Sequence, residues 1–259
     1  MSTKGKKERI KRIVDILKNE KAVTITNLAA TLKVSYMTIR RDLIDLGNDG
    51  LAEILNGVVM LKPDYASTSE RKYSLTDAGS HMLDAKERIG RLAATFIKDN
   101  DIIIIDTGST AEFLARNIPD NISVTILCYT INTLMEVYRK NCNIIFAGGY
   151  LHGNTLMFES PEGLALIKRN RATTAFVTAS GISLELGVTC SNHYEDSVKR
   201  AILSSSQKQI LLADSSKFGK VRSTYFADLE EFDSVITDTG LPEEYQQALK
   251  EKGLKIYLA

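Results

Sequence analysis

Residues 34–43 read VSYMTIRRDL, and this stretch decides the fold of the first part of the chain. Three apolar residues recur at helical spacing in and just beyond it: Ile39, Leu43 and Leu46. At about 100° per residue, Arg41 points away from this apolar stripe and Arg40 lies on its flank. The stretch therefore predicts a helix with one buried face and a basic outward face.

Two further helical patterns precede this one. Residues 8–19, ERIKRIVDILKN, repeat isoleucine at helical spacing with charges on the other face. A second helix can begin at Thr24 or Thr26, and it would end before a tight turn at Lys33-Val34. Ser35 is then a favourable N-cap for the third helix. This order of helices predicts a helix-turn-helix unit. The alternative interpretation is an ordinary corner between two packed helices.

A helix-turn-helix unit presents the start of its third helix to the major groove of DNA. We therefore expect DNA contacts from the outward face of that helix: Ser35, Tyr36, Met37, Thr38, Arg40 and Arg41. Arginine can bind guanine bidentately or hold a phosphate. Asp42 lies near the apolar edge, where it can orient or pair with an arginine. The alternative is that the two arginines are ordinary surface charges.

The segment after this helix favours a β-hairpin. Residues 47–63 read GNDGLAEILNGVVMLKP, and Asn56-Gly57 separates two short apolar runs. A hairpin that follows a recognition helix is a wing. Residues 1–75 also carry 14 Lys and Arg against 9 Asp and Glu, whereas the remainder carries 19 against 23. This asymmetry favours double-stranded DNA as the partner of the N-terminal unit.

The rest of the chain points to a second domain. We expect a DNA-binding domain at 1–62, a polar linker at 63–77, and an effector domain at 78–259 that opens with a helix from about residue 80 to 97. No apolar run approaches the roughly 18 residues that span a bilayer, and the basic N-terminus leads into no apolar signal core. We therefore expect a cytoplasmic protein. Three scattered cysteines and three histidines give weak support for a metal site and none for a disulfide framework, and we expect neither a metal nor a cofactor.

From residue 100 onward, strand-like and helix-like segments alternate. The expected strands are 102–106, 123–127, 143–147, 173–179, 209–214, 234–238 and 255–258. Such alternation predicts an α/β fold with a mostly parallel sheet and a ligand site outside the carboxyl ends of its strands.

Four loops after these strands carry candidate ligand-binding residues. In DTGST, residues 106–110, a glycine is followed by hydroxyl residues that begin a helix, which suits a phosphate group. The others are AGGYLHG at 147–153, the glycine-rich loop and helix at 178–201, and DSSKFGK at 214–220. Each lysine there can be an ordinary surface charge, and DTGST an ordinary turn. Together they favour an anionic ligand.

The motif RRD at 40–42 and the hairpin after it resemble the DeoR-type bacterial transcriptional regulators. DTGST, the Gly-Gly loop, the VKRA stretch at 198–201 and DSSKFG resemble the effector domain of the same family. That resemblance implies a Rossmann-like fold similar to sugar-phosphate isomerases and a sugar-phosphate effector. Segments 128–134, 148–154, 188–192 and 216–222 look like the member that controls deoxyribonucleoside catabolism, which implies deoxyribose 5-phosphate.

The resemblance implies these effector-binding residues: Asp106, Thr107, Gly108, Ser109, Thr110, Asn132, Gly148, Gly149, Glu195, Lys199, Asp214 and Lys217. The chain departs from the family in having Lys33 where many turns have glycine, Asn56-Gly57 where many wings end in Gly-Gly, and Ser180 where many members carry an aspartate.

The sequence thus predicts a homo-oligomeric repressor, not an enzyme, that a sugar phosphate releases from its operator. The alternatives are a regulator tuned to another sugar phosphate, an activator, or a sugar-phosphate isomerase with a DNA-binding appendage.

Overall fold

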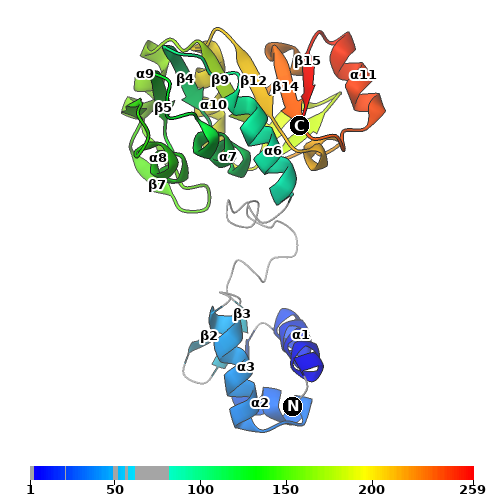
Figure 1. Cartoon of the computed structure of the whole chain (residues 1–259). Helices are drawn as coiled ribbons and strands as arrows, with labels where there is room; N and C mark the ends of the chain where they lie inside the picture. The colour runs from blue at the N-terminus through cyan, green and yellow to red at the C-terminus, as the bar shows by residue number, and fades with distance from the viewer. Residues whose placement is uncertain (1–2, 21, 49–51, 56–57, 62–81) are drawn as a thin grey trace. The chain divides into compact units, whose positions relative to one another are not determined.

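The computed structural model describes residues 3–20, 22–48, 52–55, 58–61 and 82–259. The chain divides into two compact units, Met1–Lys72 and Tyr73–Ala259 (Figure 1). The expected linker at 63–77, the two domain boundaries beside it and the Asn56-Gly57 turn lie outside the described residues.

The N-terminal unit holds a helix-turn-helix and a small sheet. Its helices are α1 (Thr3–Glu20), α2 (Ile25–Leu32) and α3 (Tyr36–Asn48), and its strands are β1 (Ala22–Thr24), β2 (Ala52–Leu55) and β3 (Val58–Leu61). The strands pair antiparallel in the order β1-β3-β2, so the predicted hairpin is present as β2 and β3. Ile39, Leu43 and Leu46 are at most 1% exposed, which confirms the apolar stripe of α3.

The ends of α2 and α3 are defined by the residues that the sequence singled out. The Thr24 hydroxyl accepts a hydrogen bond from the amide of Asn27 at 3.2 Å, so Thr24 caps α2. The Ser35 hydroxyl accepts one from the amide of Thr38, also at 3.2 Å, at the start of α3. Between them Lys33 has a left-handed φ of 54°, a conformation that glycine adopts at lower cost.

The C-terminal unit is built on a seven-stranded sheet in the order β15-β14-β12-β9-β4-β5-β6. The strands are β4 (Asp101–Ile105), β5 (Val124–Cys128), β6 (Asn143–Phe146), β9 (Thr174–Thr178), β12 (Gln209–Leu212), β14 (Ser234–Thr237) and β15 (Lys255–Leu258). Every neighbouring pair is parallel. The seven predicted strands and their parallel arrangement are confirmed.

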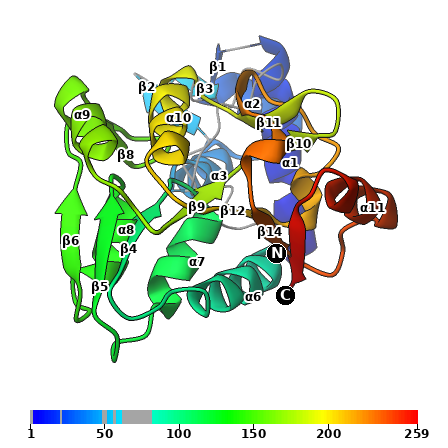
Figure 2. The ribbon, with the colours of Figure 1, turned by 90° about the horizontal axis from the view of Figure 1, so that it is seen from above.

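Helices cover both faces of this sheet. Alternate residues of β4 point to opposite sides, so Ile103 and Ile105 belong to one apolar core and Ile104 to the other. The first core includes α6 (Leu83–Ala94), α7 (Ser109–Asn117) and α8 (Ile131–Val137). The second includes α9 (Pro161–Arg169), α10 (Asp196–Ser204) and α11 (Glu243–Glu251). Figure 2 shows α6 and α7 lying side by side.

Several short elements were not predicted from the sequence. They are the hairpin β7 (Tyr150–His152) and β8 (Met157–Glu159), the small sheet β10 (Gly181–Ser183), β11 (Gly187–Cys190) and β13 (Thr224–Ala227), and the 3-10 turns η1 (His193–Glu195), η2 (Ser215–Lys217) and η3 (Leu229–Glu231). Such short strands carry too few residues for a period to stand out. In the part of the chain that the structure describes, no helix combines the length and apolarity that crossing a membrane requires.

The strand order fixes where a ligand site is expected. From β4 the chain runs outward through β5 to β6, and it then returns to the other side of β4 as β9 before continuing to β12, β14 and β15. The topology therefore switches direction between β4 and β9. In parallel sheets of this kind, ligands bind in the crevice outside the carboxyl ends at that point.

Candidate effector site and nucleic-acid interface

A buried carboxylate lies at the topological switch point. Asp106 directly follows β4, and its Oδ2 accepts a hydrogen bond from the backbone amide of Thr178, at the end of β9, at 2.8 Å. The segment after β4 approaches the end of β9 closely because residue 108 is glycine. A Cβ on Gly108 would lie 2.7 Å from the Thr178 hydroxyl, and its φ of 142° also disfavours other residues.

Asp106, Tyr129, Thr178, Glu195 and Lys199 form what we call the Asp106 cluster. The Lys199 ammonium group donates to Asp106 Oδ2 at 2.5 Å and to the carbonyl of Thr178 at 3.0 Å. The Tyr129 hydroxyl donates to the other carboxylate oxygen of Asp106. Glu195 completes the cluster, with Oε2 at 3.8 Å from the Lys199 ammonium group.

The cluster is held dry, and its charges compensate one another. Burial raises the pKa of Glu195, and only part of this effect is offset by Lys199. Burial opposes the charge of Lys199, yet Asp106 and Glu195 outweigh it, so the pKa of Lys199 is raised. Burial also raises the pKa of Tyr129 well above its ordinary value. Lys199 therefore carries a charge that is already neutralised within the protein.

A chain of amides connects the cluster to the β7–β8 hairpin. Glu195 accepts a hydrogen bond from Asn192 at 2.7 Å, and the Asn192 side-chain oxygen accepts one from Asn154 at 3.2 Å. The Tyr194 hydroxyl donates to Asn154 at 2.7 Å, and its ring stacks on His152 with centroids 3.7 Å apart. Amide and hydroxyl groups in such a network suit the hydroxyls of a sugar.

The sequence predicts an anion site at the start of α7. Its N-cap is Gly108, which has no side chain to cap the helix, and Ser109 and Thr110 are only 8% and 5% exposed. The free amides and the positive end of the helix dipole lie at the sheet edge, where an anion is stabilised. Thr107 faces inward instead, since its hydroxyl donates to the carbonyl of Thr155 at 3.3 Å.

A second polar group lies at the end of β12. Asp214 is fully buried, its Oδ1 accepts from the amide of Ser216 at 3.1 Å, and its Oδ2 lies 4.0 Å from the Lys217 ammonium group. Among the described residues, that Oδ2 has no hydrogen-bond partner. Lys86, on α6, is 1% exposed, and its charge interacts with both Asp214 and Lys217. Burial lowers the pKa of Lys217 and lowers that of Lys86 to about 8.

The remaining expected residues have other contacts. Gly149 has a φ of 148°, and a Cβ there would lie 2.3 Å from the carbonyl oxygen of Glu159, so this glycine serves the β7–β8 hairpin. The carbonyl of Gly148 accepts from the Ser160 hydroxyl at 2.9 Å. Asn132, on α8, donates to Glu112 at 3.3 Å, and its buried oxygen is without a hydrogen-bond partner among the residues described.

The structure thus brings Asp106, Glu195 and Lys199 into direct contact and leaves Asp214 with Lys217 as a neighbouring group. Sequence reasoning did not name these members: Tyr129, Thr178, Asn192, Asn154 and Lys86, although Thr178 and Asn192 lie in the candidate loop and helix at 178–201. Tyr129 and Thr178 follow or end predicted strands, and that position could have pointed to them. Lys86 carried no such signal, because a lysine in an amphipathic helix reads as part of the solvent face.

On the N-terminal unit, α3 presents the face expected to meet DNA. Tyr36 and Met37 are 45% and 54% exposed, Ser35, Arg40 and Arg41 are exposed, and Thr38 is half-buried. Asp42 is 2% exposed and pairs with Arg9 of α1, at 2.5 Å and 3.1 Å. That pair fastens α1 to α3 and leaves the two α3 arginines to the outward face.

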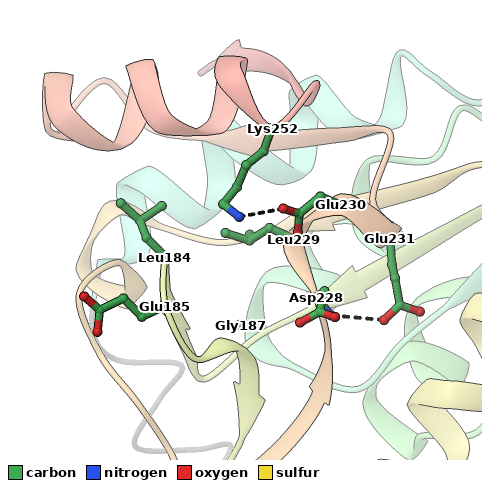
Figure 3. A pocket seen from close by; sticks show the side chains of 8 residues that line it. All are labelled: Leu184, Glu185, Gly187, Asp228, Leu229, Glu230, Glu231 and Lys252. Atoms are coloured by element: carbon green, nitrogen blue, oxygen red, sulfur yellow. Dashed lines mark hydrogen bonds and ion pairs between the residues drawn. The ribbon is translucent and has the colours of Figure 1, made fainter.

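A separate surface pocket of about 450 Å³ lies near the end of α11. Figure 3 shows its lining, which includes an ion pair between Lys252 and Glu230 at 2.5 Å. None of the expected effector residues lines it. Among the described residues, no group of histidine, cysteine and carboxylate side chains could hold a metal ion.

Two family models match the chain. The DeoR-like helix-turn-helix domain matches residues 9–64, and the DeoR C terminal sensor domain matches residues 81–239. The chain belongs to the DeoR family of transcriptional regulators. Its N-terminal unit is the DNA-binding domain of that family, and its C-terminal unit is the sensor domain.

Relatives match over almost the whole chain. The deoxyribose operon repressor of Escherichia coli K12 is 32% identical over 252 residues, which cover 97% of this chain and 98% of that protein. The HTH-type transcriptional regulator GolR of Listeria innocua is 30% identical over 97% of this chain and 98% of its own. A ribose 5-phosphate isomerase from Plasmodium falciparum overlaps 53% of each chain, with 18% identity and a TM-score of 0.39, which is too low to carry the likeness further.

Proposed function

We propose that this DeoR-family regulator is a repressor that leaves its operator when a sugar phosphate binds the sensor domain. The observation that carries this proposal is the position of the Asp106 cluster at the switch point, beside the N-terminus of α7. A helix N-terminus favours a phosphate group, and the cluster and its amide chain favour sugar hydroxyls. In this proposal the protein works in the cytoplasm, together with its operator DNA.

Each part of the ligand has proposed contacts. The amides and hydroxyls of Ser109 and Thr110 hold the phosphate. Lys217 neutralises it, because Lys199 is already paired with Asp106. Asp214 accepts a hydrogen bond from the sugar through its unpaired Oδ2, and Asn132 contributes its own buried oxygen. Glu195 orients hydroxyl groups through Asn192.

The preferred ligand in this proposal is deoxyribose 5-phosphate. Its support is the 32% identity to the deoxyribose operon repressor over nearly the full length of both chains. Other relatives at similar identity carry other names, so the choice of sugar is open to direct test.

Release follows from linkage. If the sugar phosphate and the operator favour different conformations or subunit arrangements, each weakens the binding of the other by the same factor. A symmetric homo-oligomer fits this scheme, since helix-turn-helix proteins bind paired half-sites.

The test is a competition experiment on full-length protein bound to operator DNA. Deoxyribose 5-phosphate should release the DNA, and free deoxyribose should not. Lys217→Ala should bind operator as the wild type does and fail to respond to the ligand. Equal responses to phosphorylated and free sugar would overturn the phosphate site, and a response to another sugar phosphate alone would overturn the choice of deoxyribose 5-phosphate.

The same protein should show no isomerase turnover, because Ser180 stands where an acidic residue would serve proton transfer in the family's loop. Pentose and hexose phosphates can be incubated with the protein and followed by NMR. Multiple turnovers that Asp106→Asn abolishes would contradict a purely regulatory role.

A further inference from the structure

The β7–β8 hairpin packs against the carboxyl ends of β4 and β5. The amide of Ile131, shortly after β5, donates to the carbonyl of Leu156 at 2.9 Å. The Thr107 hydroxyl, shortly after β4, donates to the carbonyl of Thr155 at 3.3 Å. The turn of the hairpin therefore lies beside the segment that leads into α7, where we propose that the phosphate binds.

Aromatic and polar contacts join the same hairpin to η1. The ring of His152 stacks on Tyr194, with centroids 3.7 Å apart and planes that differ by 9°. Glu159 holds this ring from within the hairpin, since its Oε2 lies 2.7 Å from Nε2 of His152. The Tyr194 hydroxyl donates to Oδ1 of Asn154 at 2.7 Å and lies 3.3 Å from the hydroxyl of Thr155. The stack and these hydrogen bonds hold Asn154 against η1.

Asn192 joins this arrangement to the Asp106 cluster. Its Oδ1 accepts from Asn154 at 3.2 Å and its Nδ2 donates to Glu195 at 2.7 Å, so its amide is held from both sides. Glu195 is 3% exposed, whereas Asn192 is half-buried. The amide of Asn192, rather than the carboxylate behind it, is therefore open to a ligand.

The hydrogen-bonding groups of Asn192 fit a hydroxyl group. The two bonds that its side chain makes within the described residues use one donor proton and one acceptor site, and a carboxamide offers two of each. A hydroxyl group both donates and accepts, whereas a phosphate dianion only accepts. An amide that is already held in one orientation also loses little conformational freedom when it binds. Asn192 is thus suited to the sugar end of the ligand.

We propose that Tyr194, held by the stacked ring of His152, is the positioning residue that keeps the Asn192 amide in place to bind a hydroxyl group of the effector. This inference rests on the proposed function and deepens it, because it assigns the sugar end of the same site to η1 and the hairpin. Tyr194 acts through Asn154 on Asn192. The phosphate end of the site, at the start of α7, does not depend on these contacts.

The experiment uses full-length Tyr194→Phe, which removes one hydroxyl and keeps the ring that stacks on His152. Calorimetry should show that its affinity for deoxyribose 5-phosphate falls about 3–10-fold, as expected for the loss of one neutral hydrogen bond. Asn192→Ala removes the proposed ligand contact and should lower the affinity about 10–100-fold. The matched control is Tyr138→Phe, which removes an exposed hydroxyl at the end of α8 and should bind as the wild type does.

A double-mutant cycle separates positioning from an independent effect. If Tyr194 acts through Asn192, Tyr194→Phe should lower ligand affinity no more than about twofold when Asn192 is already alanine. Losses that add in full in the double variant would overturn the positioning role. If wild type binds no sugar phosphate, the proposed function fails and this inference fails with it. If wild type binds and Tyr194→Phe binds equally well, this inference alone is overturned.

A conservative pair of variants tests His152. His152→Ala removes the stacked ring and should lower ligand affinity at least as far as Tyr194→Phe does. His152→Phe restores a ring and should bring the affinity closer to that of wild type than to that of His152→Ala. Equal losses in the two would contradict the role given to the stack. Every variant should unfold cooperatively and keep operator affinity without ligand within about threefold of wild type; a larger common loss would show a general folding defect and overturn the inference.

Discussion

The Lys199 ammonium group lies 2.5 Å from Oδ2 of Asp106, and the two side chains are 1% and 0% exposed. The pair joins α10 to the end of β4 across the switch point of the sheet. Its charges satisfy each other, so the cluster can stay dry without a ligand and still present hydroxyl and amide groups to one. If the cluster binds the ligand as we propose, stability and ligand recognition are tied to the same residues.

Lys199→Met should destabilise the sensor domain by about 3–5 kcal/mol, because Asp106 would be left as a buried charge without its cation. Chemical denaturation monitored on the full-length protein measures this. The control is Arg200→Met, the next residue, whose ion pair with Glu231 is about half exposed and contributes no more than about 1 kcal/mol. Equal losses in the two variants would contradict a buried, mutually dependent pair.

Arg41→Ala should weaken operator binding by about 1–3 kcal/mol and relax sequence preference if the side chain reads a base. If it contacts phosphate alone, affinity should fall evenly over sequences and the salt slope should drop by about one. Titrations at several salt concentrations distinguish the two. Arg91→Ala, which removes an arginine that is 68% exposed on the sensor domain, should change neither quantity. If Arg41→Ala changes neither operator affinity nor the salt slope, Arg41 is an ordinary surface charge.

Lys33→Gly should stabilise the N-terminal unit by about 0.5–1 kcal/mol, because glycine adopts the left-handed conformation at this turn without the usual cost. Lys33→Ala is the matched control: it removes the same side chain and keeps the strained φ. Denaturation of both variants gives the comparison. Equal stability of the two would show that the turn stores no such strain.

Lys86 should impose a pH dependence on stability. Burial lowers its pKa from 10.5 to about 8, so between these pH values the folded chain binds fewer protons than the unfolded chain. The free energy of unfolding of wild type should therefore rise with pH in this window, relative to Lys86→Met, by on the order of 2 kcal/mol. Denaturation at pH 7, 8, 9 and 10 tests this. If the difference in free energy of unfolding between the two proteins stays constant with pH, the pKa of Lys86 is not strongly lowered.

Much of the fold follows from the sequence because its signals are local. The apolar runs of the seven parallel strands, the caps Thr24 and Ser35 and the stripe of α3 each depend on residues close in the chain. The strand order does not follow from local residues, since it is set by how helices pack over the sheet. Without the strand order, the switch point between β4 and β9 could not be located.

The site was predictable only in part for the same reason. Asp106 and Lys199 stood out in their loops, but their contact spans 93 positions in the chain. The sequence left open whether Lys199 or Lys217 would pair with a phosphate, and this contact favours Lys217 because the charge of Lys199 is already paired with Asp106. Lys86 became visible only when α6 was placed against β12 and β14, which buries a side chain that the sequence pattern assigns to solvent.

The regulatory proposal is tested most directly by reciprocal titration of one full-length preparation. Operator affinity is measured with and without saturating deoxyribose 5-phosphate, and the affinity for deoxyribose 5-phosphate is measured with and without saturating operator. Linkage requires both to weaken by the same factor, expected at about 5–150-fold. Calorimetry verifies that the protein is saturated with the sugar phosphate. If operator affinity is then unchanged, the protein is not a repressor that this ligand releases.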